Sequence, residues 1–146
     1  MAPGPYRQAM PPQRTAERAV LIVDDDPDIL QTLALCLSTE GYRTLMASNG
    51  LEALEILKDE EPSAILLDLM MPVMDGWQFV AELDARGLRH MPLLILSADR
   101  AVQGHATKLR ANGHLAKPFD LDELLGKVLQ LTGGPRAAFP ERKNGR

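Results

Sequence analysis

The sequence predicts an α/β fold, a doubly wound five-stranded parallel sheet with helices on both faces. Two observations lead to this prediction. Short runs rich in leucine and β-branched residues alternate with longer segments of helical periodicity. Three of the short runs are almost continuously apolar, which is typical of parallel strands covered on both sides. Five strand–helix units follow one another along the chain, so we expect five strands and five helices.

Five short runs are predicted to be the strands. Each run is followed by polar or turn-forming residues, as expected at the end of a strand. The predicted strands are Ala19–Val23, Arg43–Ala47, Ala64–Leu67, Leu93–Leu96 and His114–Ala116. The first, third and fourth are the apolar runs, and we expect helices over both of their faces.

Residues that favour helix starts precede four of the helical segments. Asp26 stands before Pro27, whose fixed φ suits a first turn, and Asp120 has Glu123 three residues on. The predicted N-caps are Asp26, Asn49, Asp75 and Asp120. Apolar residues on the first and fifth helical segments recur at helical spacing, so these faces are expected to pack on the sheet.

The two ends of the chain lack such a pattern. The chain has 146 residues, which suits one domain. Residues 1–18 contain four prolines, and residues 132–146 begin with Thr-Gly-Gly-Pro. We therefore predict a single domain over residues 19–131, with flexible tails at 1–18 and 132–146.

Charge is distributed unevenly between the tails and the predicted domain. The whole chain has a formal charge of −4, the tails together carry +5, and residues 19–131 therefore carry −9. An acidic domain repels nucleic acid and favours cationic or metal partners. Direct binding of nucleic acid by the domain is not expected.

Membrane insertion is not expected either. The longest apolar runs, such as 64–67 and 93–96, are far shorter than the roughly 20 residues needed to span a bilayer. The N-terminal segment has no apolar core of a secretory signal. Cys36 is the single cysteine and cannot form an internal disulfide, which favours a cytoplasmic location.

Polar side chains follow the predicted strands at their carboxyl ends, where doubly wound sheets bind ligands. These residues are Asp24, Asp25 and Asp26 after the first strand, Asp68 after the third, Ser97 and Ala98 after the fourth, and Lys117 after the fifth. Clustered carboxylates repel one another unless a cation neutralises them, and oxygen ligands suit Mg²⁺. Plainer interpretations are a helix cap for Asp26 or Ser97 and a surface lysine for Lys117.

Four segments resemble, in order, the motif blocks of response-regulator receiver domains. They are Val20–Asp26, Leu67–Gly76, Leu94–Ala98 and Ala116–Phe119. The resemblance extends from Ala19 to about Leu131 and is closest to single-domain, chemotaxis-regulator-like members. It implies a flavodoxin-like sheet with strand order 2-1-3-4-5.

The resemblance also implies a phosphorylation site that depends on a metal. Asp68 corresponds to the phosphoacceptor and Asp25 to a direct metal ligand. Asp24 corresponds to a neighbouring carboxylate that acts in the second shell or through water, and Met70 contributes its backbone carbonyl. The implied metal is Mg²⁺, for which Mn²⁺ can substitute.

The remaining family positions implied by the resemblance concern the response to phosphorylation. Ser97 corresponds to the switch hydroxyl, Ala98 lends its backbone amide, and Lys117 pairs with a phosphoryl oxygen. His114 stands at the position of the switch aromatic. The implied switching surface consists of the fourth helix, the fifth strand and the fifth helix.

The resemblance further implies the partners and the kind of activity. A histidine kinase or a phosphotransfer protein would supply the phosphoryl group to this cytoplasmic member of a two-component system, and a downstream effector protein would read the result. The domain would be a signalling switch and not an enzyme, with self-catalysed phosphotransfer and slow autodephosphorylation only.

Two positions depart from the family pattern. The segment between Ser97 and Lys117 is shorter than in most members, and Gly104 lies near the middle of its helix, where glycine is unfavourable. We therefore expect the fourth helix to be short, irregular or mobile. His114 replaces the usual Tyr or Phe, which puts the usual aromatic rotation in doubt.

Three alternatives remain open from the sequence. The first is a pseudo-receiver, a binding module that keeps the fold without being phosphorylated. The second is an aspartate-nucleophile phosphatase of the haloacid dehalogenase type, suggested by Asp24 and Asp26, although the chain has little room for a cap. The third, a dinucleotide-binding domain, lacks its glycine-rich phosphate loop after the first strand.

Overall fold

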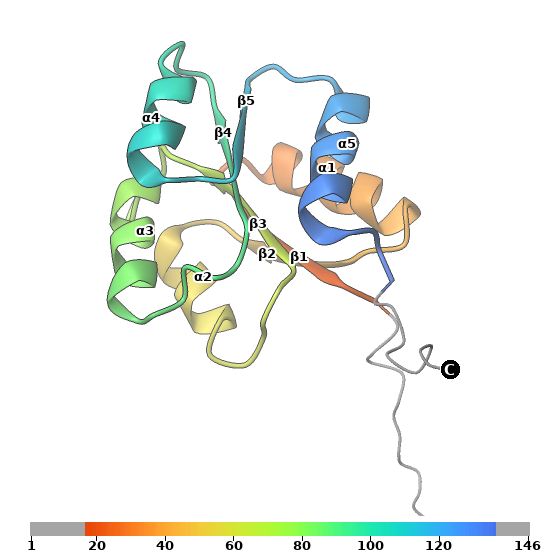
Figure 1. Cartoon of the computed structure of the whole chain (residues 1–146), viewed down its shortest axis with the longest axis horizontal. Helices are drawn as coiled ribbons and strands as arrows, with labels where there is room; N and C mark the ends of the chain where they lie inside the picture. The colour runs from red at the N-terminus through yellow and green to blue at the C-terminus, as the bar shows by residue number, and fades with distance from the viewer. Residues whose placement is uncertain (1–16, 137–146) are drawn as a thin grey trace, which may run out of the picture.

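The computed structural model describes residues 17–136, in which five strands alternate with five helices (Figure 1). The strands are β1 (Ala19–Val23), β2 (Arg43–Ala47), β3 (Ala64–Asp68), β4 (Leu93–Ser97) and β5 (Gly113–Ala116). The helices are α1 (Pro27–Thr39), α2 (Gly50–Ile56), α3 (Gly76–Ala85), α4 (Val102–Leu109) and α5 (Leu121–Thr132). The predicted element order is confirmed.

The strands form one parallel sheet in the order β2-β1-β3-β4-β5, as predicted. β1, β3 and β4 lie inside the sheet, and all of their residues are buried. β2 and β5 form the edges and are more exposed. The three apolar runs of the sequence are therefore the three inner strands.

The helices cover the two faces of the sheet, with α1 and α5 on one face and α2, α3 and α4 on the other (Figure 1). Successive strand residues point to opposite faces. Val20 and Ile22 of β1 accordingly pack in the core under α1 and α5, whereas Leu21 and Val23 pack in the core under α2 and α3. Two apolar cores fix the sheet between its helix layers.

The four predicted N-caps are confirmed. The side chains of Asp26, Asn49, Asp75 and Asp120 each accept a hydrogen bond from a backbone amide in the first turn of α1, α2, α3 and α5. α4 differs, because its N-cap is Ala101, which has no side chain to accept one. α4 is short, as expected, and its eight residues form a regular α-helix.

The chain ends of the described part lie together beyond the amino ends of the strands. Glu17 and Arg136 form an antiparallel bridge, and the Arg18 amide donates to the Pro135 carbonyl at 2.8 Å. The Arg18 guanidinium donates to the carbonyls of Thr132 and Gly134. Residues 17, 18 and 132–136 of the predicted tails thus pack on the domain, and the rest of both tails lies outside the described residues.

Among residues 17–136, no helix combines the length and the apolar composition that crossing a bilayer requires.

Candidate functional site

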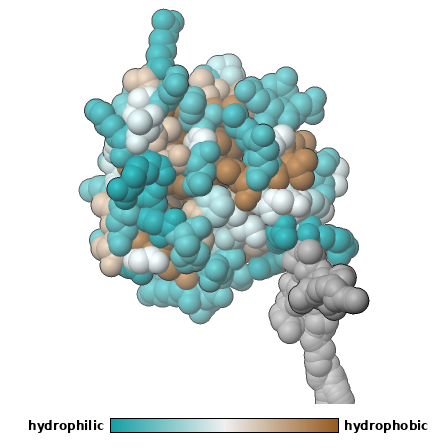
Figure 2. Space-filling model, viewed as in Figure 1, coloured by the Kyte–Doolittle hydropathy of each residue, from teal (hydrophilic) through white to brown (hydrophobic). Residues whose placement is uncertain are grey.

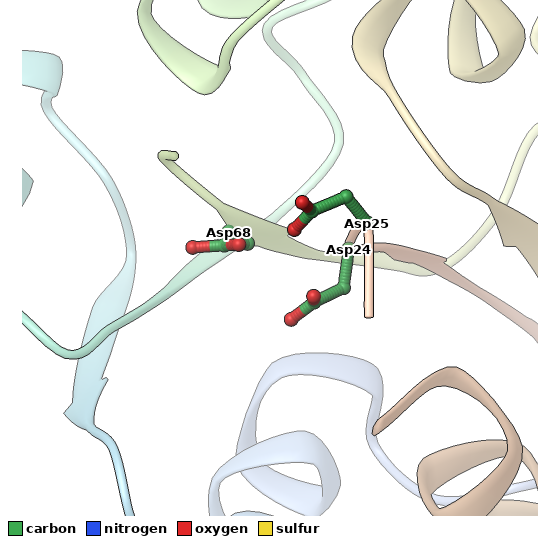
Figure 3. A group of neighbouring side chains, drawn as sticks. All are labelled: Asp24, Asp25 and Asp68. Carbon is green, nitrogen blue, oxygen red and sulfur yellow. The ribbon is translucent and has the colours of Figure 1, made fainter. Parts of the chain in front are cut away.

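Three carboxylates meet at the carboxyl end of the sheet. Asp24 and Asp25 directly follow β1, and Asp68 is the last residue of β3, the neighbouring strand. One oxygen from each carboxylate lies within 4.8 Å of the others, and Figure 3 shows the three side chains gathered at the ends of β1 and β3. Asp24 is fully buried, Asp68 is buried and Asp25 is exposed. The predicted convergence of these residues is confirmed.

Lys117 supplies the positive charge nearest to this cluster. It follows β5, and its Nζ lies 2.7 Å from Asp24 Oδ2 and 3.6 Å from Asp68 Oδ2. The peptide bond between Lys117 and Pro118 is cis. The ammonium therefore joins the two buried carboxylates and offsets part of their repulsion.

The environment of Asp68 disfavours a bare carboxylate. Burial raises the pKa of Asp68 above its ordinary value, the Lys117 ammonium lowers this pKa in part, and the Asp24 carboxylate raises it again. The Met70 amide donates weakly to Asp68 Oδ1 at 3.3 Å. Binding of a proton, a metal ion or another cationic partner would therefore stabilise the Asp68 side chain.

Both oxygens of Asp24 have partners. Its Oδ1 accepts from the Asp26 amide at 2.9 Å, and its Oδ2 accepts from Lys117. Asp26 itself turns away, because its side chain accepts from the Asp28 amide at 2.9 Å and caps α1. The plain interpretation of Asp26 as a helix cap is therefore correct, and the site contains the first two carboxylates of the Asp triplet.

Gly76 is a residue beside the site at which only glycine fits, and the sequence alone does not reveal this. A Cβ atom at Gly76 would lie 2.7 Å from Leu69 Cα and 2.8 Å from the carbonyl oxygen of Asp68. The Gly76 amide also donates to the Leu69 carbonyl at 2.9 Å. Asp75 forms a capping box with Gln78 at the same place. The start of α3 thus lies against the main chain at the end of β3, where only glycine fits.

Ser97 ends β4, between the strands that carry Asp68 and Lys117. Its side chain is buried, and its Oγ accepts from the Asp99 amide at 3.1 Å. The Lys117 amide donates to the Ser97 carbonyl at 2.8 Å, which sets β5 beside it. Ala98, the next residue, is exposed. A buried hydroxyl and an exposed loop residue therefore stand at the end of β4, the strand next to the one that ends in Asp68.

Met70 and His114 differ from the charged residues in their exposure and contacts. The Met70 side chain is exposed. His114 is half-buried in β5, opposite Ile95, and lines a hollow of about 340 Å³ with residues of α4 and α5. Within residues 17–136, no hydrogen bond or ion pair joins His114 to the carboxylate cluster.

An apolar groove opens next to Lys117. It encloses about 500 Å³ between α1 and the loop from β5 to α5, and its lining includes Ile29, Leu33, Pro118 and Phe119. On the α1–α5 side of the view in Figure 2, hydrophobic atoms reach the surface between hydrophilic ones. The charged site thus has an apolar surface beside it.

Comparisons with known proteins agree with this arrangement. A family model described as the response regulator receiver domain matches residues 20–129. The response regulator MprA of Mycobacterium ulcerans is 38% identical over 114 residues, which are 77% of this chain and 49% of MprA. The chain therefore spans about half the length of the curated relatives that it matches.

Solved structures show the same fold. The chemotaxis response regulator CheY4 of Vibrio cholerae has a TM-score of 0.72 at 30% identity, over 79% of this chain and 98% of that one. Response regulator TrrA of Thermotoga maritima, in complex with Mg²⁺-BeF, has a TM-score of 0.70 at 30% identity, over 78% and 98%. The chain belongs to the response regulator receiver domain family of two-component systems.

Proposed function

We propose that this receiver domain takes a phosphoryl group onto Asp68 from the phosphohistidine of a histidine kinase or a phosphotransfer protein. One observation carries the proposal. The buried Asp68 carboxylate lies 3.6 Å from the Lys117 ammonium, within a group of three carboxylates that meet at the carboxyl end of the sheet. An acceptor oxygen, a cation and a cluster of metal-ligating oxygens are therefore in one place.

The residues of the cluster fit a hard divalent cation. Three carboxylate oxygens within 4.8 Å of one another are the donors that Mg²⁺ prefers, and Mn²⁺ accepts the same set. Asp25 and Asp68 would hold the ion directly, with the backbone carbonyl of Met70, and Asp24 would act beside them or through water. When bound, the ion would neutralise negative charge on the acceptor and on the phosphoryl oxygens. The solved structure of TrrA in complex with Mg²⁺-BeF supports the choice of Mg²⁺.

The groups of the chain itself account for the transfer. A carboxylate oxygen of Asp68 bonds to phosphorus as the phosphorus–nitrogen bond to the donor imidazole breaks, which leaves an acyl phosphate on Asp68. Lys117, already 3.6 Å from Asp68, pairs with a phosphoryl oxygen. The Ser97 hydroxyl and the Ala98 amide donate to the remaining oxygens. The chain therefore supplies positioning and charge, which dominate phosphoryl transfer.

The outcome is a switch and not steady turnover. A new dianion on Asp68 attracts the Ser97 hydroxyl, and the loop after β4 follows Ser97. The surface formed by α4, β5 and α5, which includes His114, then changes for a downstream effector protein. Slow attack of water on the acyl phosphate resets the domain.

The surroundings of the site suit protein partners. The apolar groove between α1 and the β5–α5 loop lies beside Lys117, where a helix of the kinase or phosphotransfer protein can bring its phosphohistidine to Asp68. The charge of −9 over residues 19–131 disfavours direct contact with nucleic acid. The cytoplasmic location expected from the sequence stays a prediction.

The pseudo-receiver alternative is not favoured. A binding module without phosphorylation has no need to bury Asp24 and Asp68 side by side, because burying carboxylates together costs free energy. In this chain the acidic pair, the lysine and the hydroxyl-bearing Ser97 all border one site.

Intact-mass measurement after incubation with acetyl phosphate and Mg²⁺ tests the proposal. We expect one added phosphoryl group, about 80 Da, in the wild type. Asp68→Asn should remain unlabelled. Asp59→Asn, which changes an exposed aspartate after α2, is the matched control and should label like the wild type. Full labelling of Asp68→Asn would move the acceptor to another residue.

A further inference from the structure

A chain of contacts connects α4 with the Ser97 hydroxyl. Ser97 Oγ accepts from the Asp99 amide at 3.1 Å. The Asp99 carboxylate accepts from the Ala101 amide at 2.8 Å and lies 3.0 Å from His105 Nε2. His105 is therefore linked, through one aspartate, to the predicted switch hydroxyl.

The His105 ring is itself fixed by α3. It meets the Trp77 ring edge-on, with 5.1 Å between ring centroids and an interplanar angle of 85°, an arrangement that aromatic rings favour. The His105 side chain is 25% exposed, compared with 53% for Asp99. The histidine is thus the better-held member of the pair, and it holds the more exposed carboxylate in place.

α4 depends on such outside contacts at both of its ends. Its N-cap, Ala101, has no side-chain hydrogen bond, and the helix buries only Val102 and Ala106. At the other end, the Arg89 guanidinium donates to the carbonyls of Leu109 at 2.8 Å and Arg110 at 3.0 Å. Separate contacts hold the two ends, so the N-terminal end can be released while the C-terminal end stays attached.

We propose that His105 is a positioning residue that holds the β4–α4 loop, residues 98–101, in its unphosphorylated conformation by restraining Asp99. The loop conformation that offers the Asp99 amide to Ser97 Oγ keeps this hydroxyl in one orientation. When Ser97 turns to donate to a phosphoryl group on Asp68, its oxygen leaves that amide, and the loop must rearrange against the restraint of His105. The proposal rests on the proposed roles of Asp68 and Ser97.

The first test is made without ligand, so that it does not depend on phosphorylation. Amide hydrogen exchange is compared between the wild type, His105→Ala and the control His90→Ala, whose histidine pairs with the exposed Glu61 at 3.4 Å. We expect faster exchange at residues 99–102 in His105→Ala alone. Unchanged exchange there, or equally faster exchange throughout α3 and α4, would overturn the proposal, since the latter marks a merely structural role.

The second test uses beryllofluoride with Mg²⁺ as a stand-in for the phosphoryl group. Because His105 favours the unphosphorylated conformation, His105→Ala should bind beryllofluoride about threefold more tightly than the wild type or His90→Ala. His105→Gln, which keeps an N–H donor, should return the affinity toward that of the wild type. Equal affinities for the wild type and a folded His105→Ala would contradict the proposal.

Trp77, the only tryptophan in the sequence, gives a spectroscopic signature. We expect beryllofluoride to change its emission in the wild type, because rearrangement of Asp99 changes the hydrogen bonding of the His105 ring that contacts Trp77, and to change it far less in His105→Ala. Equal emission changes in both proteins would contradict the proposal. A wild type that takes up neither beryllofluoride nor a phosphoryl group would instead refute the proposed function, while the ligand-free exchange test would still decide the role of His105.

Discussion

The two ends of the parallel sheet are built in opposite ways. At the carboxyl end, three carboxylates crowd within 4.8 Å and share one lysine. At the amino end, the Arg18 guanidinium donates to carbonyls at the end of α5, and the Tyr42 hydroxyl lies 3.0 Å from the buried Thr132 hydroxyl. The first end concentrates like charge, whereas the second satisfies polar groups. Repulsion between carboxylates therefore costs stability at the carboxyl end of the sheet, and hydrogen bonds add stability at the amino end.

The largest effect is expected from Lys117→Ala. Removing the ammonium leaves the buried carboxylates of Asp24 and Asp68 without compensation, so we expect a loss of about 3 kcal/mol in the free energy of unfolding without metal. Denaturant unfolding at pH 7 measures this loss. The control, Lys58→Ala, removes an exposed lysine paired with Glu55 and should have little effect. An equal small loss in both variants would show that the carboxyl end needs no internal cation.

Arg18→Ala tests the opposite end of the sheet. It removes the hydrogen bonds to the carbonyls of Thr132 and Gly134, and we expect a loss of about 1–2 kcal/mol in the same unfolding experiment. Labelling by acetyl phosphate should stay at the wild-type level, because the substitution is remote from Asp68. A marked change in the labelling rate would mean that the two ends of the sheet are coupled.

Asp25→Ala separates metal binding from stability. Without metal, this variant should fold as well as the wild type or better, because one of three repelling carboxylates is gone. With Mg²⁺, it should gain much less in Tm than the wild type, since binding to the folded state stabilises by mass action. Thermal scans with Mg²⁺ and with a chelator measure both effects. The same gain in Tm for both proteins would remove Asp25 from the metal ligands.

The smallest expected effect is a dependence on pH. Burial raises the pKa of Asp68 in the folded protein, so the folded state binds this proton more tightly than the unfolded state does. The metal-free wild type should therefore lose stability from this group as pH rises from the ordinary aspartate pKa through the raised one. Asp68→Asn should lack this component. Identical pH profiles for the two proteins would show that Asp68 is not destabilised by its burial.

Local patterns in the sequence were enough to predict the elements and most of the site. Alternating apolar runs predicted the strands to within one residue at each end, and the predicted caps lie where Asp26, Asn49 and Asp75 stand. Asp68 and Ser97 were expected just after their strands and are instead the last strand residues. The pattern of apolar residues predicts which side chains are buried. It does not show which residue is the last to join the sheet through main-chain hydrogen bonds.

Contacts between distant segments could not be predicted in this way. Arg89 binds the end of α4 some 20 positions later, and Arg18 binds the end of α5, 114 positions away. The His105–Asp99 pair depends on side-chain rotamers as well as on spacing. The close approach of Gly76 to the Asp68 carbonyl becomes visible only when α3 is placed against β3. Tertiary packing, and not local preference, determines these features.

The bridge between Glu17 and Arg136 makes the described fold almost a closed ring. A short linker between these two residues would allow circular permutation, with new ends opened between Lys58 and Asp59 in the exposed turn after α2. Such a permutant keeps all five strands whole and puts both the joint and the opening away from the carboxyl end of β3. We expect it to fold and to take a phosphoryl group from acetyl phosphate onto Asp68, with release of acetate, which would make the domain a compact insert for building phosphorylation-driven sensors.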